Sequence, residues 1–395
     1  MRKEADEALN RALKIAENHQ SKLMLTGILP TLRQENFKPD YMTDVGRYHM
    51  LDRELHKMRG KAFQINIDGK DPLKMKCDNM TLEGANTSFQ LHLRIEPEKF
   101  ADTFNAAQLM TPMSVALAAN SPLLLGHRLW QETRVALFRQ SIDYRLRDNV
   151  NWRQPSRISF GYGWVRDGAY ELFSEAVALY PSLFPILSKE DPLEALKEGH
   201  LPELGELNLH MGTTWPWNRA VYSDAAGGHL RIEMRSLPSG PSLVDMAANA
   251  AFLIGLTIGF RSDVREILPS LPFRDAEYNF YRAAQSGLDA KIIWPDKRQR
   301  QSSEKPIIEV IRSLLPLMDV GLSEIGIDQD EIKLYKQNIE HRLNARITGS
   351  SWQVMMLEKY KNEGLSIEDS CKAMTLKYIE QQYNSKSIVE WQTDP

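Results

Sequence analysis

The stretch HMGTTWPWNRAVYSDAAGGHLRIEMRSLPSGPSLVDMAANAAFLIGLTIG, residues 210–259, decides the fold of this chain. Its centre, 229–235, alternates strictly between apolar and charged side chains, which is typical of a strand with one buried face. Two prolines in the turn LPSGP end this strand, because proline cannot donate a ladder hydrogen bond. Ser242 is then placed to cap a helix over 243–258, which is apolar on nearly all sides and is therefore predicted to be buried.

The charged face of this predicted strand carries four ionisable side chains: His229, Arg231, Glu233 and Arg235. Segment 89–96 repeats the pattern opposite an apolar face of its own. Its polar side chains are Gln90, His92, Arg94 and Glu96. The solvated outer face of an antiparallel sheet would show the same alternation, so this interpretation stays open, although the recurrence favours a functional face. We expect 89–96 and 229–235, together with the alternating segment 61–68, to be strands of one sheet with a shared polar face.

The composition is that of a soluble globular protein without a polyelectrolyte partner. Its 395 residues include 26% charged side chains, and the net charge is −3. A net charge of −3 does not indicate the basic surface that nucleic-acid binding needs, so we exclude nucleic acid as a partner. Two cysteines exclude a disulfide framework, and the charged, helix-periodic residues 1–20 are not a secretory signal. The apolar segment 243–258 falls short of the ~20 residues that span a membrane. A cytoplasmic chain without membrane contact is predicted.

The order of the predicted elements indicates an α+β chain. We expect one antiparallel sheet with helices packed on one face, within a first domain over 1–296. The charged segment 297–305 is most simply an exposed linker. A helical C-terminal region over 297–395 follows. Its amphipathic helices are predicted over 307–315, 329–344 and 367–383.

Short catalytic motifs give little help. The sequence contains no Walker loop, no GxGxxG after a strand, no GxSxG, no HExxH and no Cys/His zinc spacing. What remains around the sheet-like segments is a set of carboxylates, one imidazole and several arginines: Glu83, His92, Arg134, Arg219, Glu233 and Arg235. Such a set suits a Mg²⁺–phosphate site, because Mg²⁺ takes oxygen ligands and arginine neutralises a transferring phosphoryl group. By itself this is a weak signal.

Five segments resemble the glutamate–cysteine ligase family, most closely its bacterial branch of carboxylate–amine ligases. The longest, 207–241, contains LNLHMGTTWPWNRAVYS and HLRIEMRSLPSGP. The others are LTGILPTLR (25–33), TLEGANTSFQLHLRI (81–95), AANSPLLLGHRLWQETRVALFRQSID (118–143) and ITGSSWQ (347–353). The resemblance implies a glutamine-synthetase-like catalytic fold, in which the polar face of an antiparallel sheet holds ATP and Mg²⁺.

The family reaction that the resemblance implies activates the γ-carboxylate of glutamate with ATP, as an acyl phosphate, which an amine such as cysteine then attacks. By position, His92 and Glu233 resemble the metal ligands, and Glu83 is a further candidate carboxylate. Arg235 resembles the arginine at the transferring phosphate. It forms the predicted catalytic pair with Glu233, and Gln90 on the same face is expected to contact the nucleotide. The predicted substrate-binding residues are Arg134, Asn218 and Arg219.

Each assignment has a structural alternative. A strand histidine such as His92 is often only hydrogen-bonded, and Glu233 could simply pair with its neighbouring arginines. Arg134 could equally be a charge on a helix surface. Trp215 and Trp217 are expected to pack rather than to bind a base.

The sequence departs from the family at its start. Relatives begin with a strand that carries a Gly-x-Glu-x-Glu motif, whereas Met1 already lies at or after the helix that should follow it. We therefore expect the N-terminal strand to be lacking, the metal site to be incomplete and Mg²⁺–ATP to bind weakly. The rival prediction is a non-catalytic relative that binds a nucleotide, an amino acid or a protein partner without turnover. A homo-oligomer is compatible with either prediction.

Overall fold

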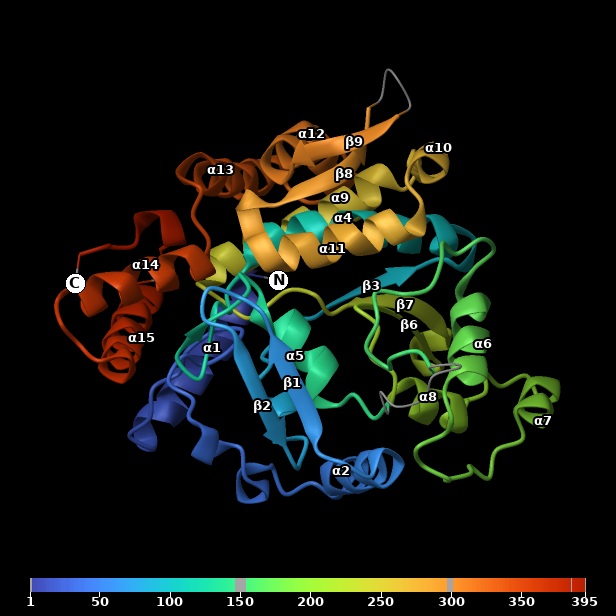
Figure 1. The fold of residues 1–395 in the computed structure, drawn as a ribbon. Coiled ribbons are helices and arrows are strands. Elements are labelled where there is room, and N and C mark those ends of the chain that lie inside the picture. Colours follow the sequence, from blue (N-terminus) through green and yellow to red (C-terminus); the bar gives the residue numbers. More distant parts are fainter. Residues whose placement is uncertain (1, 146–153, 297–300, 385, 395) are drawn as a thin grey trace.

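The computed structural model describes residues 2–145, 154–296, 301–384 and 386–394. Helices predominate, and the strands form small antiparallel sheets, so the predicted α+β class is confirmed. Figure 1 shows long helices gathered above a central sheet, further helices beside and below it, and a separate hairpin and the C-terminal helices at its flank.

The central sheet has three antiparallel strands in the order β3 (Leu91–Ile95), β7 (His229–Met234) and β6 (Asn218–Ser223). His92 is paired with Glu233, which is itself paired with Arg219, so that one row of polar side chains crosses all three strands. The neighbouring apolar row, which includes Ile232 and Met234, is buried against the helices. The predicted adjacency of 89–96 and 229–235, with a shared polar face, is confirmed.

The alternating segment 61–68 is not part of this sheet, and that prediction is wrong. Its strand β1 (Phe63–Ile67) pairs with β2 (Leu73–Cys77) in a separate hairpin. The apolar side chains of β1 are buried in a second cluster that includes residues of α5 (Thr133–Ser141). Alternation specifies which face of a strand is buried, but not which strand it pairs with. The connection to β2 is short, so pairing with β2 has a lower entropic cost of loop closure than pairing with a strand distant in the chain.

The helix after the sheet is the centre of the core. Helix α9 (Leu243–Phe260) begins at Ser242, whose side chain accepts a hydrogen bond from the backbone N–H of Asp245, as predicted. It packs between α4 (Phe100–Ala118) and α12 (Ile307–Glu324). Among the described residues α9 is the one helix long and apolar enough to cross a membrane, but 83% of it is buried inside the protein. It is therefore a core helix.

Helices α9 and α12 approach each other closely enough for their backbones to touch. A Cβ added at Gly259 would lie 2.0 Å from the carbonyl oxygen of Leu317, and one added at Gly321 would lie 2.0 Å from the carbonyl oxygen of Gly255. Glycine is required at this contact because any side chain would overlap the facing backbone.

The remaining elements complete the layers around this core. Two further hairpins pair β4 (Leu123–Leu124) with β5 (His127–Arg128) and β8 (Lys291–Pro295) with β9 (Ser302–Pro306). The longer helices are α1 (Arg2–Asn18), α2 (Gly46–Arg59), α6 (Ala169–Leu179), α11 (Phe273–Ser286), α13 (Gln329–Ala345), α14 (Gly349–Asn362) and α15 (Ile367–Tyr383). The short ones are α3 (Thr81–Gly84), α7 (Pro192–Lys197), α8 (Gly205–Met211) and α10 (Val264–Ile267).

The boundary predicted between 296 and 297 falls within the hairpin of β8 and β9, so that one strand lies on each side of it. Helix α12, which follows β9, packs on α9, whereas α14 and α15 form a cluster of their own around Trp352, Tyr378 and Trp391. The division of the chain into a catalytic and a C-terminal part stays a prediction.

Candidate active site

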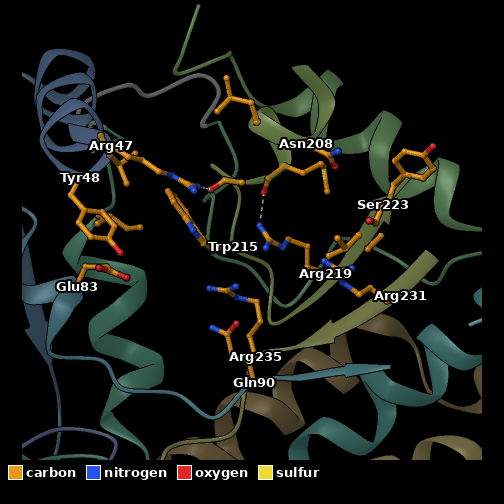
Figure 2. A pocket seen from close by; sticks show the side chains of 18 of the residues that line it. Arg47, Tyr48, Glu83, Gln90, Asn208, Trp215, Arg219, Ser223, Arg231 and Arg235 are labelled. Carbon is orange, nitrogen blue, oxygen red and sulfur yellow. Dashed lines mark hydrogen bonds between the residues drawn. The ribbon is translucent and has the colours of Figure 1, made fainter. Parts of the chain in front are cut away.

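A cavity of about 750 Å³ lies over the polar face of the central sheet. Its lining comes from β6 and β7, from α8 and the loop that follows it, and from α2 and α3, which stand across from the sheet. Figure 2 shows the cavity between Tyr48 and Glu83 on one side and Arg219 and Arg231 on the other, with Arg235 and Gln90 below. A volume of this size is typical of small-molecule and cofactor sites.

The strands place three arginines at the cavity. Arg219 belongs to β6, Arg231 belongs to β7, and Arg235 follows β7 directly. The turn between β6 and β7 contains Gly227 and Gly228, whose φ angles of 79° and 77° favour glycine. Pairing through this turn aligns the two strands, and period-two alternation then directs all three arginines to one face.

Glu233 lies in the middle of these arginines. Its Oε2 is 2.6 Å from Nε of Arg219, its Oε1 is 3.1 Å from Nη1 of Arg235, and its side chain is only 5% exposed. Burial by itself would raise the pKa of Glu233, but Arg235 and Arg219 outweigh it and hold that pKa below its ordinary value. The carboxylate is therefore ionised at neutral pH, with both oxygens in contact with guanidinium groups.

His92, the cross-strand partner of Glu233, is held by a neighbouring arginine. Nε of Arg231 donates to Nδ1 of His92 over 3.1 Å, while Nε2 of His92 lies 3.7 Å from Oε1 of Glu233. Burial lowers the pKa of His92, Glu233 opposes that shift, and Arg231 adds to it. The ring is therefore neutral at pH 7. Because Nδ1 accepts a hydrogen bond, its single proton is on Nε2.

Glu83 and Gln90 also line the cavity. Glu83 stands on α3, across from Arg219 and Arg231, and burial raises its pKa against the opposing effect of Arg235. Gln90 precedes β3 and donates from Nε2 to the hydroxyl oxygen of Ser88 over 3.1 Å. The structure thus brings Gln90, Arg219 and Arg235 to one cavity.

Two predicted substrate residues lie elsewhere. Asn218 is one residue out of phase with Arg219, so its side chain points to the apolar side of the sheet, where it donates to Gln108 and Thr111. Arg134 is 2% exposed and forms an ion pair with Glu132 at 2.9 Å. Neither residue lines the cavity. This placement gives a substrate-binding role for Asn218 or Arg134 no support, and we leave both out of the site.

Sequence reasoning did not assign Arg47 or Arg231 to the site. Arg231 was visible on the charged strand face, but its contact with His92 depends on the pairing of β3 with β7. Arg47 comes from α2, and its Nη2 donates to the backbone oxygen of Gly212 over 3.2 Å, across the cavity from the sheet. Nothing in the sequence around Arg47 indicated this contact, because it joins segments far apart in the chain.

Of the three side chains predicted to hold Mg²⁺, His92 and Glu233 do not fit this ion, and Glu83 by itself does not make a metal site. Both oxygens of Glu233 are in contact with guanidinium groups. Nδ1 of His92 accepts from Arg231, and its protonated Nε2, which faces Glu233 at 3.7 Å, has no lone pair for a metal. Within the described ranges, no group of three or more His, Cys, Asp or Glu side chains could hold a metal ion. Mg²⁺ is coordinated by six oxygen ligands in octahedral geometry, several of which can be waters. Even then at least one carboxylate oxygen must be free to bind the ion, and Glu233 has none that is free of guanidinium contacts.

Comparison with known proteins gives the class of the chain. The sequence pattern of a carboxylate–amine ligase family matches residues 1–320. The chain belongs to glutamate–cysteine ligase family 2 (GCS2), which confirms the family resemblance of its sequence motifs.

Other comparisons add little. No curated protein matches the chain. Among solved structures it is similar to the Pup ligase PafA of the prokaryotic ubiquitin-like modification pathway, in complex with ADP, with 9% sequence identity and a TM-score of 0.37. That match covers 85% of this chain, and the chain spans 64% of the length of the Pup ligase chain.

Proposed function

We propose that this chain is an ATP-dependent carboxylate–amine ligase that joins the γ-carboxylate of glutamate to an amine such as that of cysteine. One observation carries the proposal beyond the family: Arg219, Arg231 and Arg235 meet at one cavity on the polar face of the sheet. Guanidinium groups match the oxygens of carboxylates and phosphates, and a phosphoryl transfer between two anions needs such donors.

In the proposed reaction the γ-phosphoryl group passes from ATP to a carboxylate oxygen of glutamate, and ADP leaves. The amine then attacks the acyl carbon with its lone pair, the bond from that carbon to the phosphate oxygen breaks, and inorganic phosphate and a proton are released. Arg235 and Arg219 stabilise the negative charge on the transferring group. Glu233 is a positioning residue, because its contacts with both guanidinium groups fix their separation and direction.

A second candidate is a relative that binds nucleotide or amino acid without turnover. It is favoured by the side chains of His92 and Glu233, which are not suited to bind Mg²⁺ here. Ligases of this chemistry use divalent ions to withdraw charge from phosphates, and the carboxylate best placed for that role here is engaged by arginines. The two candidates differ in one observable. A ligase forms the amide, with one ADP for each amide, when ATP and both amino acids are present.

The test is to incubate the purified chain with ATP and MgCl₂, adding glutamate, cysteine, both or neither, and to measure ADP and the amide product by mass spectrometry. The expected result is amide product that requires both amino acids and is formed together with an equal amount of ADP. Arg235→Lys keeps the charge but not the planar fork, and it should lower turnover by about 10²–10³-fold. Arg274→Lys, on the exposed face of α11, is the matched control. Binding of ADP without any amide product would favour the second candidate.

A further inference from the structure

The arginines around the cavity differ from the other buried arginines of the chain in what their donors contact. Arg342, which is fully buried, gives its two terminal nitrogens to the side chain of Asn249 and the backbone of Leu117. Arg157 likewise donates to backbone oxygens of Thr213 and Pro181. Protein oxygens thus occupy the ends of these guanidinium groups, as expected for arginines that stabilise the fold.

At the cavity, guanidinium N–H groups are left over. Among the described residues, the guanidinium of Arg235 has Glu233 as its single partner. Arg219 donates from Nε to Glu233 and from Nη1 to the backbone oxygen of Met211. Arg231 uses Nε for His92 and Nη1 for His229. Each guanidinium carries five N–H donors, so Nη2 of all three arginines remains available in the part of the chain that the structure describes.

The charge of the cavity points to an anionic ligand. Arg47, Arg219, Arg231 and Arg235 line it, against the carboxylates of Glu83 and Asp224. Glu233 lies beneath them and shares its charge between two arginines, which leaves the group of guanidiniums with a net positive charge. A divalent cation placed beside these groups would be repelled, whereas an anion would be attracted, and the effect is stronger in a partly desolvated site.

We propose that this cavity binds the phosphates of a nucleoside di- or triphosphate directly through Arg219, Arg231 and Arg235, without a divalent cation. The choice of a nucleotide rests on the proposed function. The absence of a metal requirement rests on the donors alone. Phosphate oxygens are matched by the planar, bidentate fork of arginine, and several phosphates in a row can engage several arginines at once. In the proposed ligase reaction, the phosphates of the nucleotide would lie where the guanidinium groups from β6 and β7 converge.

The main test is calorimetric titration of ADP into the purified chain, in EDTA and in excess MgCl₂. We expect binding in EDTA that is at least as tight as in MgCl₂, because Mg²⁺ neutralises the charge that the arginines recognise. Binding should weaken as NaCl rises, since the contacts are ionic. Binding that appears only in MgCl₂, or that MgCl₂ tightens by about tenfold or more, would overturn the proposal.

Two competitors distinguish the sources of the phosphate chemistry. Inorganic triphosphate should displace ADP in EDTA if phosphates carry the binding, and adenosine should not. The variant Arg231→Gln leaves Glu233 with both of its arginines and should weaken ADP in EDTA by about tenfold or more, the size expected for a lost charge-assisted hydrogen bond. Arg274→Gln is the exposed control and should bind as the parent does. Unchanged affinity in Arg231→Gln, or displacement by adenosine alone, would contradict direct phosphate recognition.

This result is separate from the fate of the proposed function. A chain that binds ADP in EDTA but forms no amide would contradict the ligase proposal and support this one. A chain that forms the amide but needs MgCl₂ to bind ADP would do the reverse.

Discussion

Two carboxylate–arginine pairs with the same spacing in sequence end in different environments. Glu132 and Arg134 are separated by one residue, as are Glu233 and Arg235, and both glutamates are almost completely buried. In the first pair, Glu132 also accepts from the backbone N–H of Asn120, and Arg134 donates to the backbone oxygen of Ser236. In the second pair, the remaining donors of the arginine face a cavity.

The difference teaches that burial of a carboxylate does not identify a functional site. What distinguishes the pairs is the number and direction of their arginines. Burial raises the pKa of Glu132, which has one arginine partner. Burial acts on Glu233 in the same direction, but Arg235 and Arg219 reverse the outcome and lower its pKa. A second guanidinium thus secures the charge of Glu233 and leaves donors for a ligand.

The largest effect is expected at the structural pair. Glu132→Ala leaves the guanidinium of Arg134 buried without its carboxylate, and it should lower the free energy of unfolding by about 3–5 kcal/mol. Urea denaturation followed by circular dichroism measures this loss. The double variant Glu132→Leu with Arg134→Met removes both charges and should recover most of the stability, since apolar replacement of a buried pair is often neutral. A loss below about 1 kcal/mol in Glu132→Ala would contradict a purely structural pair.

The next largest effect concerns Asn218, which lies beside the site in sequence but under the sheet in space. Asn218→Ala removes two buried hydrogen bonds, to Gln108 and Thr111, and should cost about 1–3 kcal/mol of stability. The affinity for ADP should stay unchanged in the folded fraction. Val221→Ala, at a position facing the cavity side of β6, is the comparison. A loss of ADP affinity in Asn218→Ala at unchanged stability would return Asn218 to the site.

Substitution of Glu233 is expected to lower stability less than Asn218→Ala does, but to change the affinity for ADP more. Glu233→Gln removes one negative charge beneath the cavity, and ADP should bind a few-fold more tightly in EDTA, as about 1 kcal/mol of relieved repulsion implies. The free energy of unfolding should fall by about 1 kcal/mol, because the amide oxygen of the glutamine can still accept a hydrogen bond from Arg219 or Arg235. Glu96→Gln, exposed at the end of the same sheet, is the control. Weaker ADP binding seen only in MgCl₂ would assign Glu233 to a metal.

The smallest effect extends the comparison to a surface pair. Arg128 lowers the pKa of Asp71 to about 2 from its usual 3.8. Because the unfolded chain binds the proton first as pH falls, this pair stabilises the fold above pH 4 and loses its contribution as pH falls toward 2. Solvent screens the half-exposed Asp71, so less than about 1 kcal/mol is at stake. Melting temperatures of Asp71→Asn and the parent should converge as pH falls over this range. A constant difference would contradict the shift.

The sequence predicted well those features that depend on local alternation. The pairing of 89–96 with 229–235, and the place of His92 opposite Glu233, follow from the period of two and from the burial of one face. The cap at Ser242 and the buried helix after it follow from local chemistry. The strand 218–223 was missed, although it completes the cavity, because its mixture of polar and apolar residues does not alternate cleanly.

What could not be predicted depends on partners distant in the chain. Arg134 and Arg235 follow a glutamate at the same spacing, and the packing of α5 against β1, α3 and α11 separates their roles. The contact of Arg47 with Gly212 bridges 165 positions and has no local signature. The family motif matched His92 and Glu233 to metal ligands, but it did not reveal that the guanidinium groups of Arg231 and Arg219 contact these two side chains.

The glycine contact between α9 and α12 has a mechanical consequence for the cavity. Side chains at a helix interface can change rotamer when one helix shifts against the other. At Gly259 and Gly321 backbone lies directly against backbone, so no side chain is present that could accommodate such a shift. Helix α9 begins eight residues after Arg235, so the element that follows the floor of the cavity is held at its far end by a contact that does not yield. Alanine at Gly259 would overlap the carbonyl oxygen of Leu317, so α9 and α12 would have to separate, and we expect this local change to reach the cavity only through the turn that joins the sheet to α9.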